Sequence, residues 1–99
     1  MVRLMVLYGH PKDPAVFEQY YRDVHMPIAA QIRGVKIEMG KVLGAPDGYT
    51  APFYRIAEVM FDNTEHMQAV LATPEAQRTV ADMANFATGG VTVMVAQMA

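Results

Sequence analysis

Three observations in this 99-residue chain predict an α+β, ferredoxin-like fold. The expected elements follow the order strand, helix, strand, strand, helix, strand, which is the βαββαβ order of a split βαβ unit. The length corresponds to one domain spanning residues 1–99. No linker or low-complexity segment interrupts the pattern. We therefore expect a four-stranded antiparallel sheet with two helices on one face.

The first half of the chain predicts a strand, a helix and a second strand. Residues 2–8 are almost continuously apolar, as in a strand buried on both faces. Asp13 is a suitable N-cap and is followed by a proline, which favours the first position of a helix over residues 14–32. Apolar and polar residues alternate over residues 35–43, which predicts a strand with one wet or cleft-facing side.

The second half repeats this order. A loop rich in turn formers at residues 44–52 precedes a strand expected over residues 53–61. Residues 62–65 contain a cap for a second helix, and a further start signal at Thr73 predicts a break and restart there. Two glycines then end this helix before a last strand over residues 91–98. We expect the inner stripe of the helix to be Val80, Met83, Ala84 and Ala87.

Composition argues against several classes of partner. The net charge is −2 and the basic residues form no stripe, which argues against binding to nucleic acids or anionic membranes. There is no cysteine, and no apolar run approaches the ~20 residues of a membrane span. The N-terminus has the pattern of a strand start and not of a secretory signal, so we expect a cytoplasmic protein.

The apolar content predicts self-association. Hydrophobic residues make up 53% of the chain, which is high for so small a domain. Two helices cover one face of a sheet, yet the first and last strands are apolar on both faces. A second copy of the sheet is the simplest cover, which would give a homodimer through the sheet faces, a dimeric α/β barrel. The alternative is a monomer with an unusually apolar sheet.

His25 is the leading candidate for chemistry. Pro27 has no amide hydrogen, so the helix should kink or loosen around His25, and Met26 should leave α geometry. With Val24 on the inward face, His25 falls about 70° from the centre of that face, at the lip of a cleft. Tyr21 is its i,i+4 neighbour. Histidine titrates near neutrality and can act as general acid or base, although a half-buried histidine that bonds a kink carbonyl would look the same.

Other side chains offer supporting roles. Glu58 or Asp82 is a possible orienting acid for His25, whereas Asp23 points away from it along the helix. His10 and His66 have no metal-ligand spacing, and no nucleotide-binding motif is present, so we predict neither a metal site nor a cofactor. Aromatic side chains could line a substrate pocket or simply fill the core, and the candidates for binding are Tyr8, Tyr20, Tyr54 and Phe86.

With these residues in place, the whole chain resembles the EthD family of small dimeric α/β-barrel proteins. The pattern Tyr-x-x-x-His-x-Pro at Tyr21, His25 and Pro27 resembles the family's helix motif. Further similar segments are residues 56–62, 73–75 and 85–90, together with Asp82. The resemblance implies a ferredoxin-like protomer, a homodimer, and roles for His25 and Tyr21 as the family's histidine and tyrosine. Members are associated with ethyl tert-butyl ether degradation and are often labelled oxidoreductases.

Two functions remain open from the sequence. The first is an enzyme acting on a small hydrophobic or aromatic metabolite, with His25 as general acid/base and Tyr21 in support. Relatives of this architecture include cofactor-free monooxygenases, isomerases and dehydratases. The second is a non-catalytic module that binds a hydrophobic ligand or serves as an accessory protein in a degradation pathway. Haem binding through a histidine is a minor third option.

Overall fold

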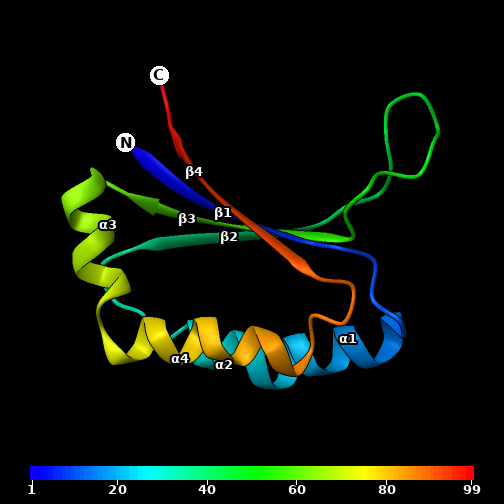
Figure 1. Cartoon of the computed structure of the whole chain (residues 1–99), viewed down its shortest axis with the longest axis horizontal. Helices are drawn as coiled ribbons and strands as arrows, with labels where there is room; N and C mark the ends of the chain where they lie inside the picture. Colours follow the sequence, from blue (N-terminus) through cyan, green and yellow to red (C-terminus); the bar gives the residue numbers. More distant parts are fainter.

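The computed structural model describes all residues 1–99 and has the predicted ferredoxin-like topology. Its four strands form one antiparallel sheet in the order β2-β3-β1-β4. Helical segments lie on one face of this sheet (Figure 1). The elements are β1 (Val2–Tyr8), α1 (Pro14–Tyr20), the π-helix η1 (Tyr21–His25), α2 (Met26–Ala29), β2 (Lys36–Lys41), β3 (Arg55–Phe61), α3 (Thr64–Leu71), α4 (Pro74–Asp82), the 3₁₀ turn η2 (Met83–Asn85) and β4 (Val91–Gln97).

The predicted helix starts are confirmed by their caps. The Asp13 side chain accepts hydrogen bonds from the amides of residues 15 and 16 at the start of α1. Asn63 accepts from the amide of His66 and begins α3. Thr73 caps α4, so the second helix does break and restart as expected. Each cap satisfies amides that the first turn of a helix leaves without a partner.

The helix ends differ from the sequence prediction. The first helical run ends at Ala29 and not at residue 32, because the amides of Gln31 and Ile32 bond three residues back and tighten the last turn. The second run leaves α geometry after Asp82, well before the glycines at 89 and 90. The expected inner stripe was also wrong in part. Val80 and Met83 face the space between the helices and the sheet, but Ala84 is exposed, and Asp82 lies on the buried face instead.

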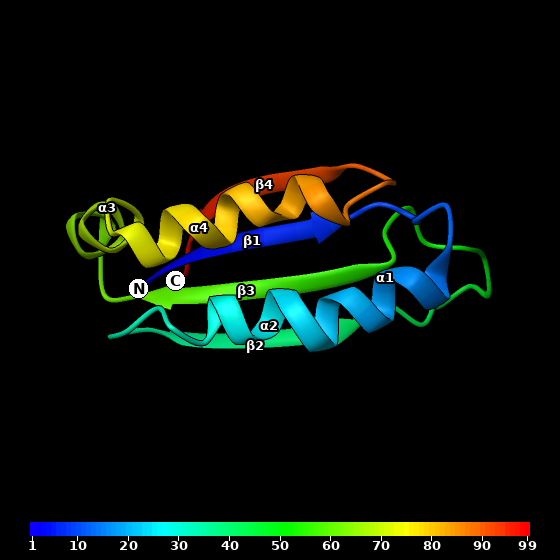
Figure 2. The same ribbon diagram turned by 90° about the horizontal axis from the view of Figure 1, so that it is seen from below.

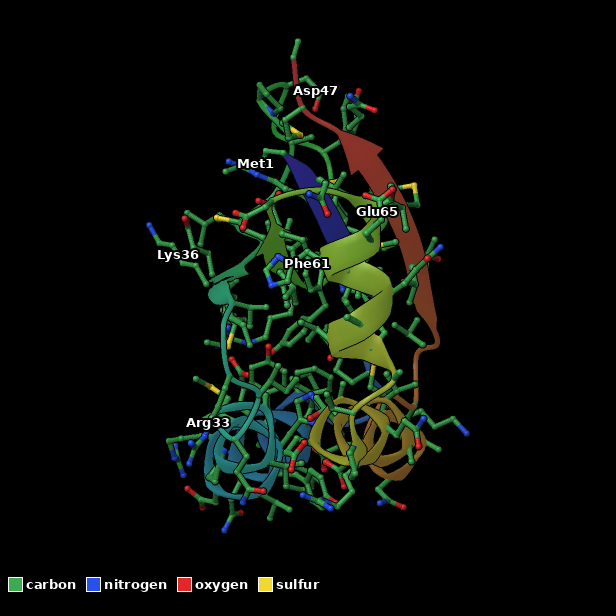
Figure 3. All side chains as sticks on the ribbon, turned by 90° about the vertical axis from the view of Figure 1, so that its left-hand side faces the viewer. Met1, Arg33, Lys36, Asp47, Phe61 and Glu65 are labelled. Carbon is green, nitrogen blue, oxygen red and sulfur yellow. The ribbon has the colours of Figure 1, made fainter.

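The helix layer is divided beneath the sheet. Viewed from below, α1 and α2 run under β2 and β3, while α4 runs under β1 and β4 (Figure 2). The short helix α3 stands across one end of the layers, with Phe61 beside it (Figure 3). Tyr8, Phe17 and Phe61 are the largest fully buried side chains. The core therefore lies between one sheet face and the helices, and α3 closes one end of that space.

The opposite face of the sheet has no helices on it (Figure 1). Side chains alternate along β1, so the burial of Val2, Val6 and Tyr8 on the helix side places Arg3, Met5 and Leu7 on this outer face. The strand register adds six neighbours to that face, Ile56, Glu58, Met60, Thr92, Met94 and Ala96. Apart from an Arg3–Glu58 ion pair at 3.0 Å, the centre of the outer face is apolar.

Candidate active site: a buried histidine and aspartate beside an apolar cavity

The π-helix η1 determines where His25 points. The amide of Met26 donates to the carbonyl of Tyr21, five residues back, so the turn contains one more residue than an α-turn. The predicted loosening around His25 is confirmed, but Met26 keeps α geometry (φ −62°, ψ −40°), contrary to expectation. The wide turn brings Tyr21 and His25 inward, at 2% and 5% exposure, and leaves Val24 39% exposed. His25 is therefore buried, and the predicted position at the edge of the inner face was wrong.

The same wide turn explains why two side chains five residues apart reach one carboxylate. In an α-helix, Tyr20 and His25 would point about 140° apart. Here Tyr20 Oη donates to Asp82 Oδ1 at 2.6 Å and His25 Nδ1 lies 2.9 Å from Asp82 Oδ2. Asn85 Nδ2 donates to Asp82 Oδ1 at 3.0 Å. Asp82 thus has three side-chain partners, and two of them come from the first helical run.

The hydrogen bonds keep this buried carboxylate ionised. Burial by itself would raise the pKa of Asp82, but the hydrogen bonds from Tyr20, Asn85 and His25 together outweigh that effect and lower it. The bond to Asp82 in turn raises the pKa of the Tyr20 hydroxyl. A carboxylate only accepts hydrogen bonds, so His25 carries its proton on Nδ1 when neutral. Its Nε2 then has a free lone pair, which is the arrangement a general base requires.

A cavity of about 200 Å³ lies between the sheet and the helices. Of its 19 lining residues, only His25 and Thr79 are not hydrophobic when tyrosine is counted with the hydrophobic ones. Thr79 Oγ1 is already bonded to the carbonyl of Glu75 at 2.9 Å. The cavity therefore presents an imidazole in an otherwise apolar wall, which is the usual composition of a small-molecule site.

Two tyrosines add hydroxyl groups to this wall. Tyr8 and Tyr21 line the cavity, are 1% and 2% exposed, and their rings lie 5.7 Å apart. Neither hydroxyl forms a hydrogen bond within the protein. Neither oxygen is fully buried, in contrast to Arg3 Nε, which has no partner and no open surface. Both hydroxyls therefore keep some open surface in residues that line the cavity. Burial raises the pKa of both hydroxyls, so both remain protonated donors near neutral pH.

The sequence-predicted binding residues fall into two groups. Tyr8 lines the cavity, whereas Tyr20 lies behind His25 and holds Asp82. Phe86 does not line the cavity but packs against the imidazole, with ring centroids 4.5 Å apart. Tyr54 is buried against Phe17, at 5.2 Å between centroids, and also does not line the cavity.

Of the acids considered as partners of His25, one contacts it and the others do not. Asp82 pairs with His25, while Glu58 lies on the outer sheet face with Arg3. Asp23 points away from His25, as predicted, and pairs with its neighbour Arg22. Asn85 was not singled out from the sequence. Asn85 follows Asp82 by three residues, which places both on one helical face, and this spacing could have indicated their contact.

The other two histidines do not line the cavity and have separate local roles. His10 Nε2 lies 2.7 Å from the carbonyl of Ala51, and His66 Nδ1 accepts from the amide of Asp62 at 3.1 Å. No group of three histidine, cysteine, aspartate or glutamate side chains is placed to hold a metal ion. None of the helices is both long and apolar enough to cross a membrane.

Comparisons with known proteins agree with this architecture. Residues 10–90 match the model of the EthD domain. An uncharacterized 11.0 kDa protein from the thcB-thcC intergenic region of Rhodococcus erythropolis is 37% identical over 94 residues, which cover 95% of this chain and 91% of that protein.

Solved structures extend the similarity. The crystal structure of an EthD family protein from Bacillus halodurans C-125 superposes with a TM-score of 0.91 at 29% identity, covering 100% of this chain and 99% of the other. A dimeric ferredoxin-like protein of unknown function from Jannaschia sp. CCS1 gives a TM-score of 0.71 at 12% identity, covering 99% of this chain and 100% of the other. The second similarity concerns the fold alone.

Proposed function

The chain belongs to the EthD domain family, and on that basis we propose that it is an enzyme that moves a proton on a small hydrophobic or aromatic molecule. In this proposal the molecule binds in the 200 Å³ cavity and His25 is the general acid/base. The observation that carries the proposal is the contact of His25 Nδ1 with Asp82 Oδ2 at 2.9 Å, with both residues buried and His25 lining an apolar cavity. Asp82 is a positioning residue that fixes the tautomer and orientation of the imidazole.

The proposed chemistry covers several reaction classes. A base at Nε2 can remove a proton from carbon or oxygen and, once protonated, return it at another atom, as isomerisation and dehydration require. Removal of a phenolic proton would also prepare an electron-rich ring for oxygenation. An oxidoreductase role in breakdown of a foreign compound, which the resemblance to the EthD family implied, would need dissolved O₂ as the electron acceptor in addition to these proton transfers. We place this activity in the cytoplasm, consistent with a chain that has no cysteine.

Hydrogen–deuterium exchange at carbon tests the base without knowledge of the natural substrate. A panel of one-ring enones, lactones and phenols is incubated with the protein in D₂O, and loss of C–H signals is followed by proton NMR. We expect His25→Ala to slow the exchange roughly 10²–10⁴-fold. His10→Ala is the matched control, because His10 lies in an exposed turn against Ala51. Equal exchange rates in the wild type and His25→Ala would overturn the catalytic role. It would also be overturned if molecules of the panel bind and none of them shows exchange that depends on the protein.

We also propose that the protein acts as a homodimer through the outer sheet face. Support comes from the apolar centre of that face and from solved neighbours that are described as dimeric. Met5 and Met94 pair across β1 and β4 there, and Met94 is 45% exposed in the single chain. We expect Met94→Glu to sediment as a monomer, whereas Val16→Glu, on the exposed side of α1, should remain dimeric. A wild type that sediments as a monomer at micromolar concentration would contradict this assembly.

A second candidate function is non-catalytic binding of a hydrophobic ligand, as an accessory protein in a degradation pathway. The observation that favours it is the near-complete apolar lining of the cavity. In this case a ligand should bind equally well to the wild type and to His25→Gln, and neither protein should convert it. Isothermal titration calorimetry together with product analysis by mass spectrometry separates the two functions. Conversion by the wild type that is lost in His25→Gln would exclude the binding-only function.

A further inference from the structure

We propose that the cavity is selective for an uncharged, one-ring molecule with an oxygen substituent, such as a phenol or a cyclic ketone, and that the hydroxyls of Tyr8 and Tyr21 bind this oxygen. The inference names the ligand class of the proposed function. Binding of the ligand is independent of that function, and only the conversion of the bound ligand rests on it. Three properties of the cavity support it, namely its size, its lack of charge and its unpaired hydroxyls.

The size of the cavity suits a ligand of one ring. The cavity measures about 200 Å³. A protein cavity of ~150 Å³ lined by aliphatic and aromatic side chains is known to hold one benzene molecule. The remaining space, about one-quarter of the cavity, accommodates a few substituent atoms on such a ring. A fused two-ring system needs more room, and the α3 residues Val70 and Leu71 line the wall at the end of the layers.

Charge excludes an ionised ligand. No lysine, arginine, aspartate or glutamate is among the lining residues, and the lining imidazole is already paired with the Asp82 carboxylate. The guanidinium of Arg55 lies over the Tyr21 ring, 5.0 Å from its centroid, but Glu18 holds it in an ion pair at 2.9 Å. A ligand carboxylate would therefore be buried near Asp82 without a free cation, which is strongly unfavourable in an apolar site.

The two hydroxyls supply the missing polar recognition. Tyr8 and Tyr21 each have a donor that the protein leaves unpaired at 1% and 2% exposure. Buried polar groups are normally hydrogen-bonded, so an unpaired hydroxyl beside a cavity favours a ligand with an acceptor. Tyr21 lies next to the proposed base, since its ring stacks on the His25 ring at 5.5 Å, and the Tyr8 ring lies 5.7 Å from the Tyr21 ring. An oxygen held by these hydroxyls would place the adjacent C–H or O–H bonds of the ring near the imidazole.

Four probes of defined chemistry test this selectivity. Phenol, toluene, benzoate and 2-naphthol are titrated into the full-length protein at pH 7 and followed by ligand-observed NMR. We expect phenol to bind more tightly than each of the other three. Toluene has the size without the oxygen, benzoate adds a charge, and 2-naphthol adds a ring. Equal affinity for phenol and toluene, or tighter binding of benzoate, would overturn the proposed ligand class.

Tyrosine variants test the role of the hydroxyls. We expect Tyr8→Phe and Tyr21→Phe each to weaken phenol binding roughly tenfold and to leave toluene binding unchanged. Tyr49→Phe is the matched control because this tyrosine is 75% exposed in the β2–β3 loop. Both variants should fold, since each removes a hydroxyl that has no partner in the protein, and thermal melts check this. Retention of the full preference for phenol over toluene in both variants would refute the assignment.

The same measurements separate this inference from the proposed function. If phenol binding depends on Tyr8 and Tyr21 but no probe or panel member shows exchange that depends on His25, the ligand class stands and the catalytic proposal fails. If exchange depends on His25 but the exchanging molecule is charged, the catalytic proposal stands and the ligand class fails.

Discussion

Replacement of Asp82 by asparagine tests whether the buried carboxylate holds the two helical runs together. Asp82 accepts hydrogen bonds from Tyr20 on one helical run, from Asn85 just beyond its own, and lies 2.9 Å from His25 Nδ1. Hydrogen bonds to charged groups contribute about 1.5–3 kcal/mol each, against about 0.5–1.5 kcal/mol for neutral pairs. An asparagine keeps one acceptor oxygen for Tyr20 and Asn85, but its amide nitrogen cannot accept the Nδ1 proton of His25. All three bonds then lose the charge of the acceptor, and the imidazole keeps its bond only by changing tautomer.

We expect Asp82→Asn to lower the free energy of unfolding by about 2–3 kcal/mol at pH 7. For a domain of this size, that corresponds to a drop in Tm of roughly 10–20 °C. Urea unfolding followed by circular dichroism measures the free energy, and scanning calorimetry measures Tm. Asp23→Asn is the control, because this exposed carboxylate pairs only with its neighbour Arg22 and should matter little.

The pH dependence of the same difference gives an independent check. The pKa of Asp82 is lower in the folded protein than in the unfolded chain, so its contribution to stability is fully present above the unfolded value of ~3.9. It is lost as the pH falls through the lower folded pKa. The gap between the wild type and Asp82→Asn should therefore shrink in acid. Measuring both in a His25→Gln background removes the titration of the imidazole.

Two results would refute this reasoning. One is an Asp82→Asn variant as stable as the wild type at pH 7, which would mean that the three hydrogen bonds add nothing beyond the cost of burial. The other is a difference that stays constant between pH 6 and pH 3, which would mean that the ionised form is not the one that the structure stabilises.

Three further substitutions test the packing around the site. At Gly89 an added Cβ would lie 2.1 Å from the carbonyl oxygen of His10, so Gly89→Ala should lower the free energy of unfolding by more than ~2 kcal/mol. Gly40→Ala is the control, because an added Cβ there has no neighbour closer than 3.6 Å and should change the free energy of unfolding by less than about 1 kcal/mol. Similar urea midpoints for these two variants would contradict the close approach. Thr73→Ala removes the cap of α4 and should cost about 1 kcal/mol, and an unchanged thermal midpoint would argue against it. Phe86→Ala deletes a ring packed on the imidazole and should cost about 3–5 kcal/mol, with a smaller loss by calorimetry indicating that the core refills the space.

The fold could be predicted because its signals are local and agree with one another. Asp13 with its following proline, Asn63 and Thr73 all mark helix starts, and each is observed as a cap. The apolar stretch of residues 2–8 identifies the central strand β1. The helix ends were less predictable, because glycines beyond a helix limit its length but do not determine which turn is the last.

The site could be predicted only in part. The proline at 27 indicated a disturbed helix, but an assumed α-period placed Val24 inward and His25 at the edge. The π-turn reversed both positions, since one extra residue rotates every side chain that follows it. Asp82 was one of two possible acids, and no local pattern separates it from Glu58. That separation depends on which side of the sheet each residue lies, and only the tertiary structure provides it.

The five-residue turn at Tyr21–His25 also makes this protein sensitive to the length of its chain. Deletion of a single residue there would let regular α-helical bonding resume and would rotate the preceding segment by about 100° relative to His25. Tyr20 and His25 could then no longer face the same carboxylate, even though every side chain of the site was still present. During evolution this segment could exchange many of its outward-facing residues, but a one-codon deletion within it would disconnect the imidazole from its support in one step.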